Sequence, residues 1–328
     1  MNARSGGAPL LSVRDLRVWF DTDQGVARAV DGVSFDVLEG ETLGIVGESG
    51  CGKTVTSLSL LGLLPRPPAR VLDDSSIRFR GEELVGASAR RLRRLRGNDI
   101  AMIFQEPMSS LNPVYPIGDQ IGEALRLHRG LDRRAARQET IRLLDEVGIA
   151  GAAQRVDDHP HQLSGGMRQR VMIAMALSCA PELLIADEPT TALDVTVQAQ
   201  ILELLASLQA ARSMAVLLIT HDLGVVAEVC DRVAVMYAGQ IVETGTVQEI
   251  FGDPRHPYTR GLLDSLPRVD DPGHRLKPIP GTVPPPTHWP DGCRFRDRCP
   301  LAAPPCAAPQ ALLDLGPEGR AARCWRAP

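Results

Sequence analysis

One glycine-rich stretch constrains this chain more than any other: residues 47–54, Gly47-Glu48-Ser49-Gly50-Cys51-Gly52-Lys53-Thr54. It follows an apolar run, 42–46, and precedes a segment, 55–64, with apolar residues at helical spacing. A glycine loop between a strand and a helix lets backbone N–H groups surround a phosphate, and the helix N-terminus adds the positive end of its dipole. In such a P-loop Lys53 reaches the β- and γ-phosphates and the Thr54 hydroxyl ligates Mg²⁺. We therefore predict a site for ATP or a similar nucleotide.

The length and composition are those of an ordinary globular protein. The 328 residues hold roughly two domains, with 44% apolar and 23% charged residues. A net charge of −4 gives no general reason to expect nucleic-acid binding, and no apolar run reaches the roughly 18–20 residues that cross a bilayer. No apolar segment of a signal peptide follows the N-terminus. We therefore predict a cytoplasmic protein whose membrane role, if it has one, is exercised through a partner.

Alternating apolar residues between positions 10 and 35 predict antiparallel strands, with turns at 21–25 and at Asp31-Gly32. Residues 1–9 are predicted to be disordered. An aromatic side chain in the first strand, Trp19 or Phe20, is a candidate for stacking on an adenine ring, and we assign Phe20 to the ATP site. An ordinary half-buried aromatic of a strand explains either residue equally well.

A buried strand, 182–186, ends in two adjacent acids, Asp187 and Glu188. In an open parallel sheet, ligands bind beyond the carboxyl ends of the strands. A carboxylate at this place suits Mg²⁺, so Asp187 is the predicted metal ligand. Glu188 is the predicted general base that polarises the attacking water. A solvated strand end is the alternative, but the apolar residues before the acids favour a central strand.

Two further buried strands end in single polar residues at the same predicted edge. Gln105 follows the strand 99–104, where its amide can bridge Mg²⁺ and the attacking water. Its position fits a surface glutamine that caps a strand equally well. His221 follows the strand 215–220, where its ring can contact the γ-phosphate, although a lone histidine is more often structural.

A second glycine motif opens the apolar helix predicted at 171–177: Leu163-Ser164-Gly165-Gly166-Met167-Arg168-Gln169-Arg170. Ser164 alone suffices for a helix N-cap. Gly166 lies where the helix already runs, and glycine lowers helix stability there. This cost favours a functional role, so we predict a second anion site at a helix N-terminus.

The pattern as a whole predicts an α/β fold. It combines a P-loop NTPase core, whose parallel sheet is RecA-like, with an N-terminal antiparallel β subdomain and an inserted helical subdomain at about 106–180. Five arginines between 90 and 96 allow a nucleic-acid contact, but leucines at helical spacing favour an amphipathic helix with a solvated face. The nucleotide-binding domain spans 10–251, and a small Cys/Pro-rich extension follows at 252–328.

The order of these motifs resembles the nucleotide-binding subunit of ABC transporters across residues 10–250. The Leu-Ser-Gly-Gly-x-x-Gln element at 163–169 is the hallmark of that family. The resemblance implies a Mg²⁺-dependent ATP hydrolase that works as a head-to-tail dimer. ATP then lies between the P-loop of one subunit and the motif 164–166 of the other, and Gln169 and Asp194 also belong to the ATP site. Cys51 stands where serine is frequent, which leaves nucleotide binding unaffected.

The resemblance also implies roles for the residues at the sheet edge. It implies Glu188 as general base, His221 as γ-phosphate sensor and Gln105 as the link to the transmembrane subunits. Taken with the chemistry above, the predicted Mg²⁺ ligands are Thr54, Gln105 and Asp187.

The last 77 residues resemble the C-terminal region of the oligopeptide/dipeptide and nickel importer ATPases, beginning at His256-Pro257-Tyr258. Some of these proteins are implied to hold a 4Fe–4S cluster there. The thiol spacing C-x5-C-x6-C-x17-C of Cys293, Cys299, Cys306 and Cys324 lacks the close pair of a zinc site, which favours iron–sulfur. Four structural thiols are the alternative. We expect a cluster there to be structural.

The family implies a set of partners: a second, related ABC ATPase, two transmembrane permease subunits and an extracytoplasmic solute-binding protein, with no nucleic acid. The chain is then a peripheral protein on the cytoplasmic face of a bacterial inner membrane that drives uptake of di- or oligopeptides or a related small solute. A soluble ABC ATPase of DNA repair or translation is the alternative from another class, although it usually has two cassettes or long coiled coils. An ABC exporter subunit is disfavoured by the C-terminal region.

Overall fold

The structure is a computed structural model, and it describes residues 8–105, 110–191, 193–266, 277–316 and 319–327. The chain divides into two compact units. The first comprises Met1–Leu38, Thr42–Gly86 and Ile219–Pro328, and the second comprises Glu39–Glu41 and Ala87–Leu218. Most of the segment predicted to be disordered, 1–7, lies outside the described residues. No helix among the described residues is both long and apolar enough to cross a membrane.

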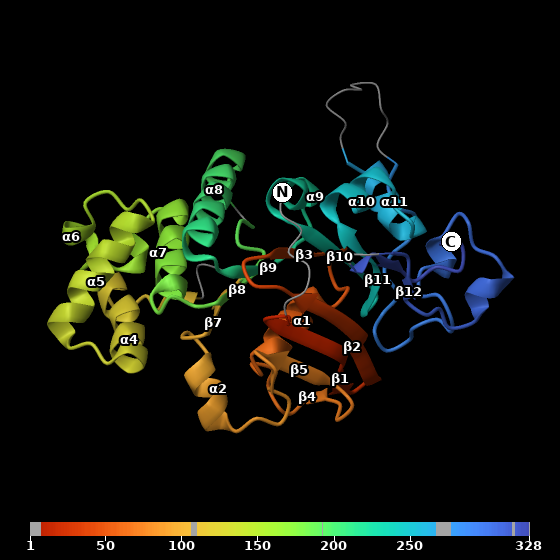
Figure 1. The fold of residues 1–328 in the computed structure, drawn as a ribbon, viewed down its shortest axis with the longest axis horizontal. Coiled ribbons are helices and arrows are strands. Elements are labelled where there is room, and N and C mark those ends of the chain that lie inside the picture. The colour runs from red at the N-terminus through yellow and green to blue at the C-terminus, as the bar shows by residue number, and fades with distance from the viewer. Residues whose placement is uncertain (1–7, 106–109, 192, 267–276, 317–318, 328) are drawn as a thin grey trace. The chain divides into compact units, whose positions relative to one another are not determined.

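The first unit contains a sheet of five strands, which Figure 1 shows in red and orange. Its order is β2-β1-β5-β6, and β4 also pairs with β1; the strands are β1 (Leu11–Thr22), β2 (Gly25–Val37), β4 (Ala69–Val71), β5 (Ser76–Phe79) and β6 (Glu82–Glu83). All these pairings are antiparallel, as predicted.

The predicted turn at Asp31-Gly32 is wrong, because β2 runs through both residues. The register of β1 against β2 shifts on either side of Leu16, and Gly32 has a φ of +82°. A glycine in this conformation accommodates a β-bulge, so the strand continues where its composition indicates a turn.

The first unit also holds the strand that leads into the P-loop, β3 (Thr42–Val46). It pairs in parallel with β10 (Arg232–Tyr237), and β10 forms the predicted hairpin with β11 (Gln240–Thr246). Two short strands near the C-terminus, β13 (Ala321–Ala322) and β12 (Leu313–Asp314), extend this sheet beyond β11. All five residues of β3 are buried, as expected of a central parallel strand.

Four α-helices complete the first unit among its described residues: α1 (Lys53–Leu60), α9 (Leu223–Val229), α10 (Val247–Gly252) and α11 (Pro257–Asp264). The helix after the P-loop was predicted at 55–64, but α1 ends at Leu60, and Gly62 follows with a φ of +59°. Two 3-10 turns, η2 (Arg296–Arg298) and η3 (Pro304–Ala307), lie in the C-terminal region.

The second unit combines buried strands with a group of helices. Strand β7 (Ile100–Ile103) pairs in parallel with β8 (Leu183–Asp187), and β9 (Ala215–Thr220) begins in this unit and ends in the first. The arginine-rich segment forms the predicted short helix, α2 (Ala89–Leu95), of which only Leu95 is buried.

The helices α4 (Ile117–Arg129), α5 (Arg133–Glu146), α6 (Ala152–Arg155) and α7 (Gly165–Leu177) lie together in Figure 1. Buried residues at helical spacing hold α4 in this group, and α8 (Val195–Arg212) completes the unit. The 3-10 turn η1 (Pro160–Gln162) leads toward α7.

Candidate functional site

The P-loop joins β3 to α1 within the first unit, as the sequence predicts. Gly52 is the N-cap of α1 and has a φ of +108°. A Cβ atom there would lie 2.5 Å from the carbonyl oxygen of Ala29, so no other residue fits without a backbone shift. Ser49, Gly50 and Thr54 are exposed along the loop, whereas Cys51 is buried. Burial raises the pKa of the Cys51 thiol, which keeps it protonated.

Lys53 folds back over the loop that precedes it. Its Nζ atom donates to the carbonyl oxygens of Gly47, at 2.7 Å, and Glu48, at 3.1 Å, and the side chain is buried. An ammonium group fixed beside the first turn of a helix attracts an anion through its own charge and through the helix dipole. The loop therefore has the chemistry of a phosphate site.

The predicted adenine contact lies on β1 of the same unit. Trp19 and Phe20 are both half-buried, and neighbouring residues of a strand point to opposite faces. The Arg28 guanidinium lies 5.0 Å from the centre of the Trp19 ring and covers one of its faces. Phe20 remains our candidate for the adenine ring.

In the second unit the structure brings Gln105 and Glu188 together. The Gln105 amide Nε2 donates to Glu188 Oε2 at 3.0 Å, although the two residues are 83 positions apart. The Thr191 hydroxyl donates to the same carboxylate oxygen at 2.9 Å. The sequence analysis did not identify Thr191 as a site residue. The available signal was its position in a turn, three residues after Glu188.

The backbone conformation of Glu188 also separates it from an ordinary strand end. Its φ of +47° is in the left-handed region, which a residue with a long side chain rarely adopts. Such strain is often found at functional sites. Asp187, the last residue of β8, is 1% exposed, so its carboxylate is largely removed from water.

The oxygen donors of Thr54, Gln105 and Asp187 are hard ligands of the kind that Mg²⁺ prefers, so their chemistry fits the metal. His221 directly follows β9 and is exposed.

The second glycine motif forms the N-terminus of α7. Ser164 is the N-cap, and its hydroxyl accepts a hydrogen bond from the Met167 N–H at 3.3 Å. A Cβ atom on Gly165 would meet no atom within 4 Å, whereas one on Gly166 would lie 2.9 Å from Val197 Cγ1. Packing against Val197 therefore explains why position 166 is a glycine. Position 165 has space for a side chain, so packing inside the unit does not explain Gly165.

Two other predicted ATP-site residues flank this motif. Gln169 is only 1% exposed, and its amide donates to the Pro189 carbonyl. In this structure it connects α7 to the loop after Glu188, and its contact with ATP stays a prediction. Asp194 is exposed and caps α8 by accepting from the Val197 N–H at 3.0 Å. Its neighbour Val195 is 83% exposed.

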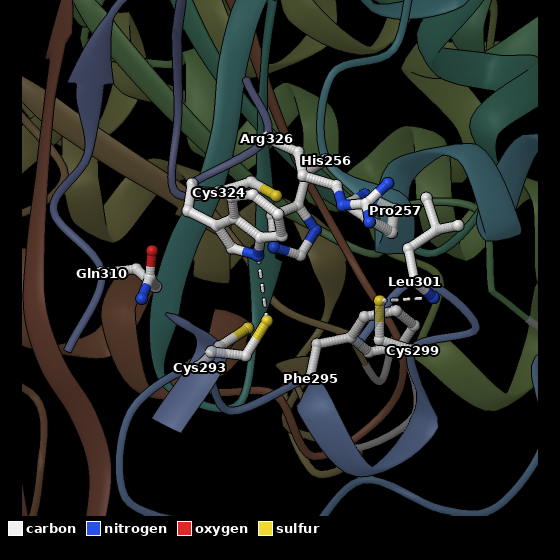
Figure 2. A pocket seen from close by; sticks show the side chains of 11 residues that line it. His256, Pro257, Cys293, Phe295, Cys299, Leu301, Gln310, Cys324 and Arg326 are labelled. Atoms are coloured by element: carbon white, nitrogen blue, oxygen red, sulfur yellow. Dashed lines mark hydrogen bonds between the residues drawn. The ribbon is translucent and has the colours of Figure 1, made fainter. Parts of the chain in front are cut away.

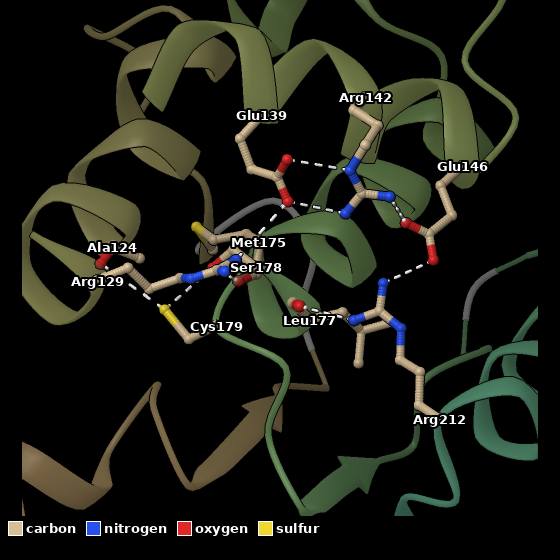
Figure 3. A network of polar contacts seen from close by, with 10 residues as sticks. All are labelled: Ala124, Arg129, Glu139, Arg142, Glu146, Met175, Leu177, Ser178, Cys179 and Arg212. Atoms are coloured by element: carbon tan, nitrogen blue, oxygen red, sulfur yellow. Dashed lines mark hydrogen bonds and ion pairs between the residues drawn. The ribbon is translucent and has the colours of Figure 1, made fainter. Parts of the chain in front are cut away.

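A polar network fixes the far end of α7 (Figure 3). Arg212 of α8 donates to the Leu177 carbonyl at 3.0 Å and pairs with Glu146 at 2.6 Å. Glu146 and Glu139 both pair with Arg142 on α5. Burial alone raises the pKa of Glu146, but Arg212 and Arg142 bring it below its usual range. The network therefore connects the C-terminal end of α7 to α5 and α8.

The four C-terminal cysteines line one pocket in the first unit, together with His256 and Trp325 (Figure 2). All four are free thiols. Burial raises the pKa of Cys293 to about 11, and Cys306, Cys324 and Cys299 add to the shift. Two N–H groups donate to sulfur: Trp325 Nε1 to Cys306 at 3.2 Å and the Leu301 backbone to Cys299 at 3.4 Å.

These thiols fit an iron–sulfur cluster in their chemistry, since such clusters take four cysteine ligands and N–H···S bonds. Their arrangement in the described residues is not that of a metal site, because no group of three or more Cys, His, Asp or Glu residues there is placed to hold a metal ion.

Comparison with known proteins identifies the family. The model of the ABC transporter family matches residues 30–191, and the model of the oligopeptide/dipeptide transporter C-terminal region matches 242–306. The dipeptide transport ATP-binding protein DppD of Bacillus subtilis is 52% identical over 316 residues, which cover 96% of this chain and 94% of DppD. A Brucella abortus protein, provisionally named a peptide import ATP-binding protein, is 55% identical over 317 residues, with 97% and 95% coverage.

Solved structures confirm the predicted fold class. CbiO1 of Clostridium perfringens, part of the ABC transporter complex cbiONQ, has a TM-score of 0.62 at 27% identity and covers 75% of this chain and 92% of its own. The dimeric bacterial ABC transporter cassette MJ0796 has a TM-score of 0.64 at 24% identity, with 72% and 98% coverage. The chain therefore belongs to the ATP-binding proteins of ABC transporters, in the branch with the oligopeptide/dipeptide transporter C-terminal region, and it is a transporter ATPase.

Proposed function

We propose that this chain hydrolyses ATP to drive the uptake of di- or oligopeptides, or of a related small solute, through a bacterial ABC importer. The observation that carries the proposal is the similarity to DppD along the whole chain, including the C-terminal region that the family model matches at 242–306. The permeases and the solute-binding protein select the solute, so its identity depends on those subunits.

In the proposed reaction the P-loop binds the phosphates of ATP. Lys53 and the amides at the start of α1 hold the β- and γ-phosphates, and Phe20 stacks on the adenine. Thr54, Gln105 and Asp187 would hold Mg²⁺, which would supply positive charge to offset the charge of the phosphates.

Glu188 accepts a proton from the attacking water. Its carboxylate is already oriented by Gln105 and Thr191, which both donate to Oε2. His221 contacts the γ-phosphate and reports its presence.

We also propose that the site is completed by a second subunit. Gly165 has open space beside it, and Asp194 is exposed at the start of α8. These features suit a head-to-tail dimer in which the motif 164–166 of one subunit covers the ATP of the other. A single chain then binds ATP but hydrolyses it poorly. The dimer partner we propose is a related ATPase.

The remaining assignments concern location and organisation. We propose a nucleotide-binding domain at 10–251, a C-terminal extension at 252–328 and a place on the cytoplasmic face of the cell membrane against two permeases. We expect the segment after Gln105 to relay closure to the permeases, and its first four residues, 106–109, lie outside the described residues.

Co-purification tests this assembly. Full-length tagged chain, extracted with detergent from the membranes of its own organism, is expected to bring down two permeases and a second ATPase.

Deletion of its gene is expected to abolish dipeptide-dependent growth of an auxotroph, with restoration by wild type and not by Lys53→Ala. Recovery of DNA or ribosomes instead of permeases would contradict the proposal and favour a soluble ABC ATPase. Unchanged uptake with increased export would favour an exporter.

The C-terminal thiols line one pocket but, among the described residues, are not placed as metal ligands in this structure. We propose that Cys293, Cys299, Cys306 and Cys324 move together to hold a structural 4Fe–4S cluster. Anaerobically purified protein is expected to contain about four iron and four acid-labile sulfide per chain, as four thiolate ligands would hold. Cys306→Ser is expected to lose the iron and to expose the C-terminal region to protease before ATP hydrolysis stops. The matched control is Cys179→Ser in the second unit, which should leave the iron content unchanged. Zinc, or no metal, in wild-type protein would contradict the cluster.

A further inference from the structure

The second residue of the P-loop, Glu48, is held by the C-terminal part of the chain. Its backbone N–H donates to the Tyr258 hydroxyl on α11 at 2.9 Å. Its carboxylate accepts two hydrogen bonds from the Arg298 guanidinium, at 2.6 and 2.9 Å. Its carbonyl oxygen accepts from Lys53 Nζ at 3.1 Å. The residue that orients the P-loop lysine is thus fixed by two side chains more than 200 positions away.

Arg298 is itself rigidly placed. Its side chain is only 6% exposed, and its Nε donates to the Pro280 carbonyl at 2.7 Å. The guanidinium also lies 5.7 Å from the Tyr237 ring centre and 5.9 Å from that of Phe295. A planar guanidinium fixed in this way presents its paired N–H groups in one orientation, which an ammonium group does not reproduce.

The aromatic residues beside Arg298 join the C-terminal region to the strand that carries the P-loop. Tyr237, Tyr258 and Phe295 are all buried, with ring centres 4.6 to 5.3 Å apart. They share one apolar cluster with Val46, the last residue of β3. The C-terminal region is therefore part of the packing around the P-loop.

The contact also has an electrostatic consequence. A carboxylate next to a phosphate site repels the ligand, and Glu48 belongs to the loop that must receive the phosphates. Arg298 neutralises this carboxylate and holds it against the C-terminal region. Loss of Arg298 then has two effects: the loop loses a support, and an uncompensated negative charge remains near the nucleotide.

We propose that Arg298 and Tyr258 are positioning residues for ATP binding, which act through Glu48 on Lys53. This inference rests on the proposed role of the P-loop as the ATP site. In this chain the C-terminal region would then contribute to nucleotide binding, through Arg298 and Tyr258.

The first measurement is the Kd of the full-length chain for a fluorescent ATP analogue with Mg²⁺. Arg298→Ala is expected to raise the Kd about tenfold, as loss of a charge-assisted hydrogen-bond pair implies. Arg298→Lys should lie between this variant and wild type. Tyr258→Phe, which removes only the acceptor of the Glu48 N–H, is expected to raise the Kd about threefold to tenfold. The last two variants preserve the packing and keep the test valid if Arg298→Ala folds poorly.

The second measurement asks whether Arg298 acts through Glu48. In a Glu48→Gln background, Arg298→Ala is expected to change the Kd by less than about twofold, because interacting residues are non-additive. In the ATPase complex the KM for ATP should rise while kcat stays nearly constant. A merely structural arginine would lower the active fraction and leave KM unchanged.

The matched control is Arg320→Ala. Arg320 also lies in the C-terminal region, is 12% exposed and pairs with Asp253 and Glu249, away from the P-loop. It should leave the Kd at the wild-type value. The inference would be overturned if Arg298→Ala changed the Kd equally in the wild-type and the Glu48→Gln backgrounds. It would also be overturned if neither Arg298 variant changed the Kd. Lys53→Ala separates it from the proposed function: if that variant binds the analogue normally, the P-loop assignment itself has failed.

Discussion

Glu188→Gln is expected to bind ATP with the affinity of the wild type and to hydrolyse it about 10² to 10⁴ times more slowly, the usual contribution of a general base. The amide has nearly the shape of the carboxylate, so packing at the end of β8 is preserved. Its oxygen still accepts one hydrogen bond, from Gln105 or Thr191, which both donate to the carboxylate in the wild type. What disappears is the ability to take a proton from water.

Because the variant binds ATP without consuming it, it should accumulate as a closed dimer. Size-exclusion chromatography with ATP and Mg²⁺ is expected to show this dimer, and ADP should not produce it. Glu203→Gln is the matched control, since Glu203 is an exposed residue of α8 in the same unit. Hydrolysis by Glu188→Gln at the wild-type rate would remove Glu188 from its role. Loss of ATP binding would instead indicate that the carboxylate mainly supports the loop.

Much of the fold could be predicted because the informative residues act locally. The P-loop, the capping serine of α7 and the acids at the end of β8 are each defined by a short pattern that matches one element. Because parallel strands end at one edge of a sheet, an amide and a carboxylate 83 residues apart could be assigned to the same edge, and within the second unit Gln105 and Glu188 do touch.

The features that the sequence did not reveal depend on partners far away along the chain. Asp31-Gly32 has the composition of a turn, but Asp31 pairs with Arg294 and Arg17 while β2 continues. The hydrogen bond from the Gln169 amide to the Pro189 carbonyl also has no local signature, and the contact of Gln169 with ATP stays a prediction. The link from Arg298 to Glu48 spans 250 residues and leaves no local pattern. The His-Pro-Tyr triplet at 256–258 was visible, but its contact with the P-loop was not.

Gly165→Asp is expected to distinguish the two parts of the proposed ATP site, the P-loop of one subunit and the motif 164–166 of the other. Gly165 is the first residue of α7, directly after the N-cap Ser164. An acidic side chain in the first turn of a helix interacts favourably with the helix dipole, and a Cβ atom at this position meets nothing within 4 Å. The variant should therefore fold at least as well as the wild type and bind ATP normally on its own P-loop.

In the head-to-tail dimer the same carboxylate would face the γ-phosphate of the ATP bound to the partner. Like charges brought together in an interface cost several kcal/mol, so ATP hydrolysis in the complex should fall about 100-fold or more. The ATP-dependent dimer should also be lost. The variant should therefore keep or gain stability while its ATP hydrolysis falls. A glycine with a purely structural role would not give this combination.

Ala89→Asp is the control, because Ala89 is the exposed first residue of α2 and follows the N-cap Ser88 in the same way. Both capping hydroxyls accept from the N–H three residues later at 3.3 Å, so the two variants introduce the same charge into the same local geometry. Thermal unfolding, ATP binding by the isolated chain and hydrolysis by the complex should be measured for both. If Gly165→Asp hydrolyses ATP as fast as Ala89→Asp, the motif at 164–166 does not face a nucleotide. If the isolated chain loses ATP binding, the motif serves its own P-loop rather than that of a second subunit.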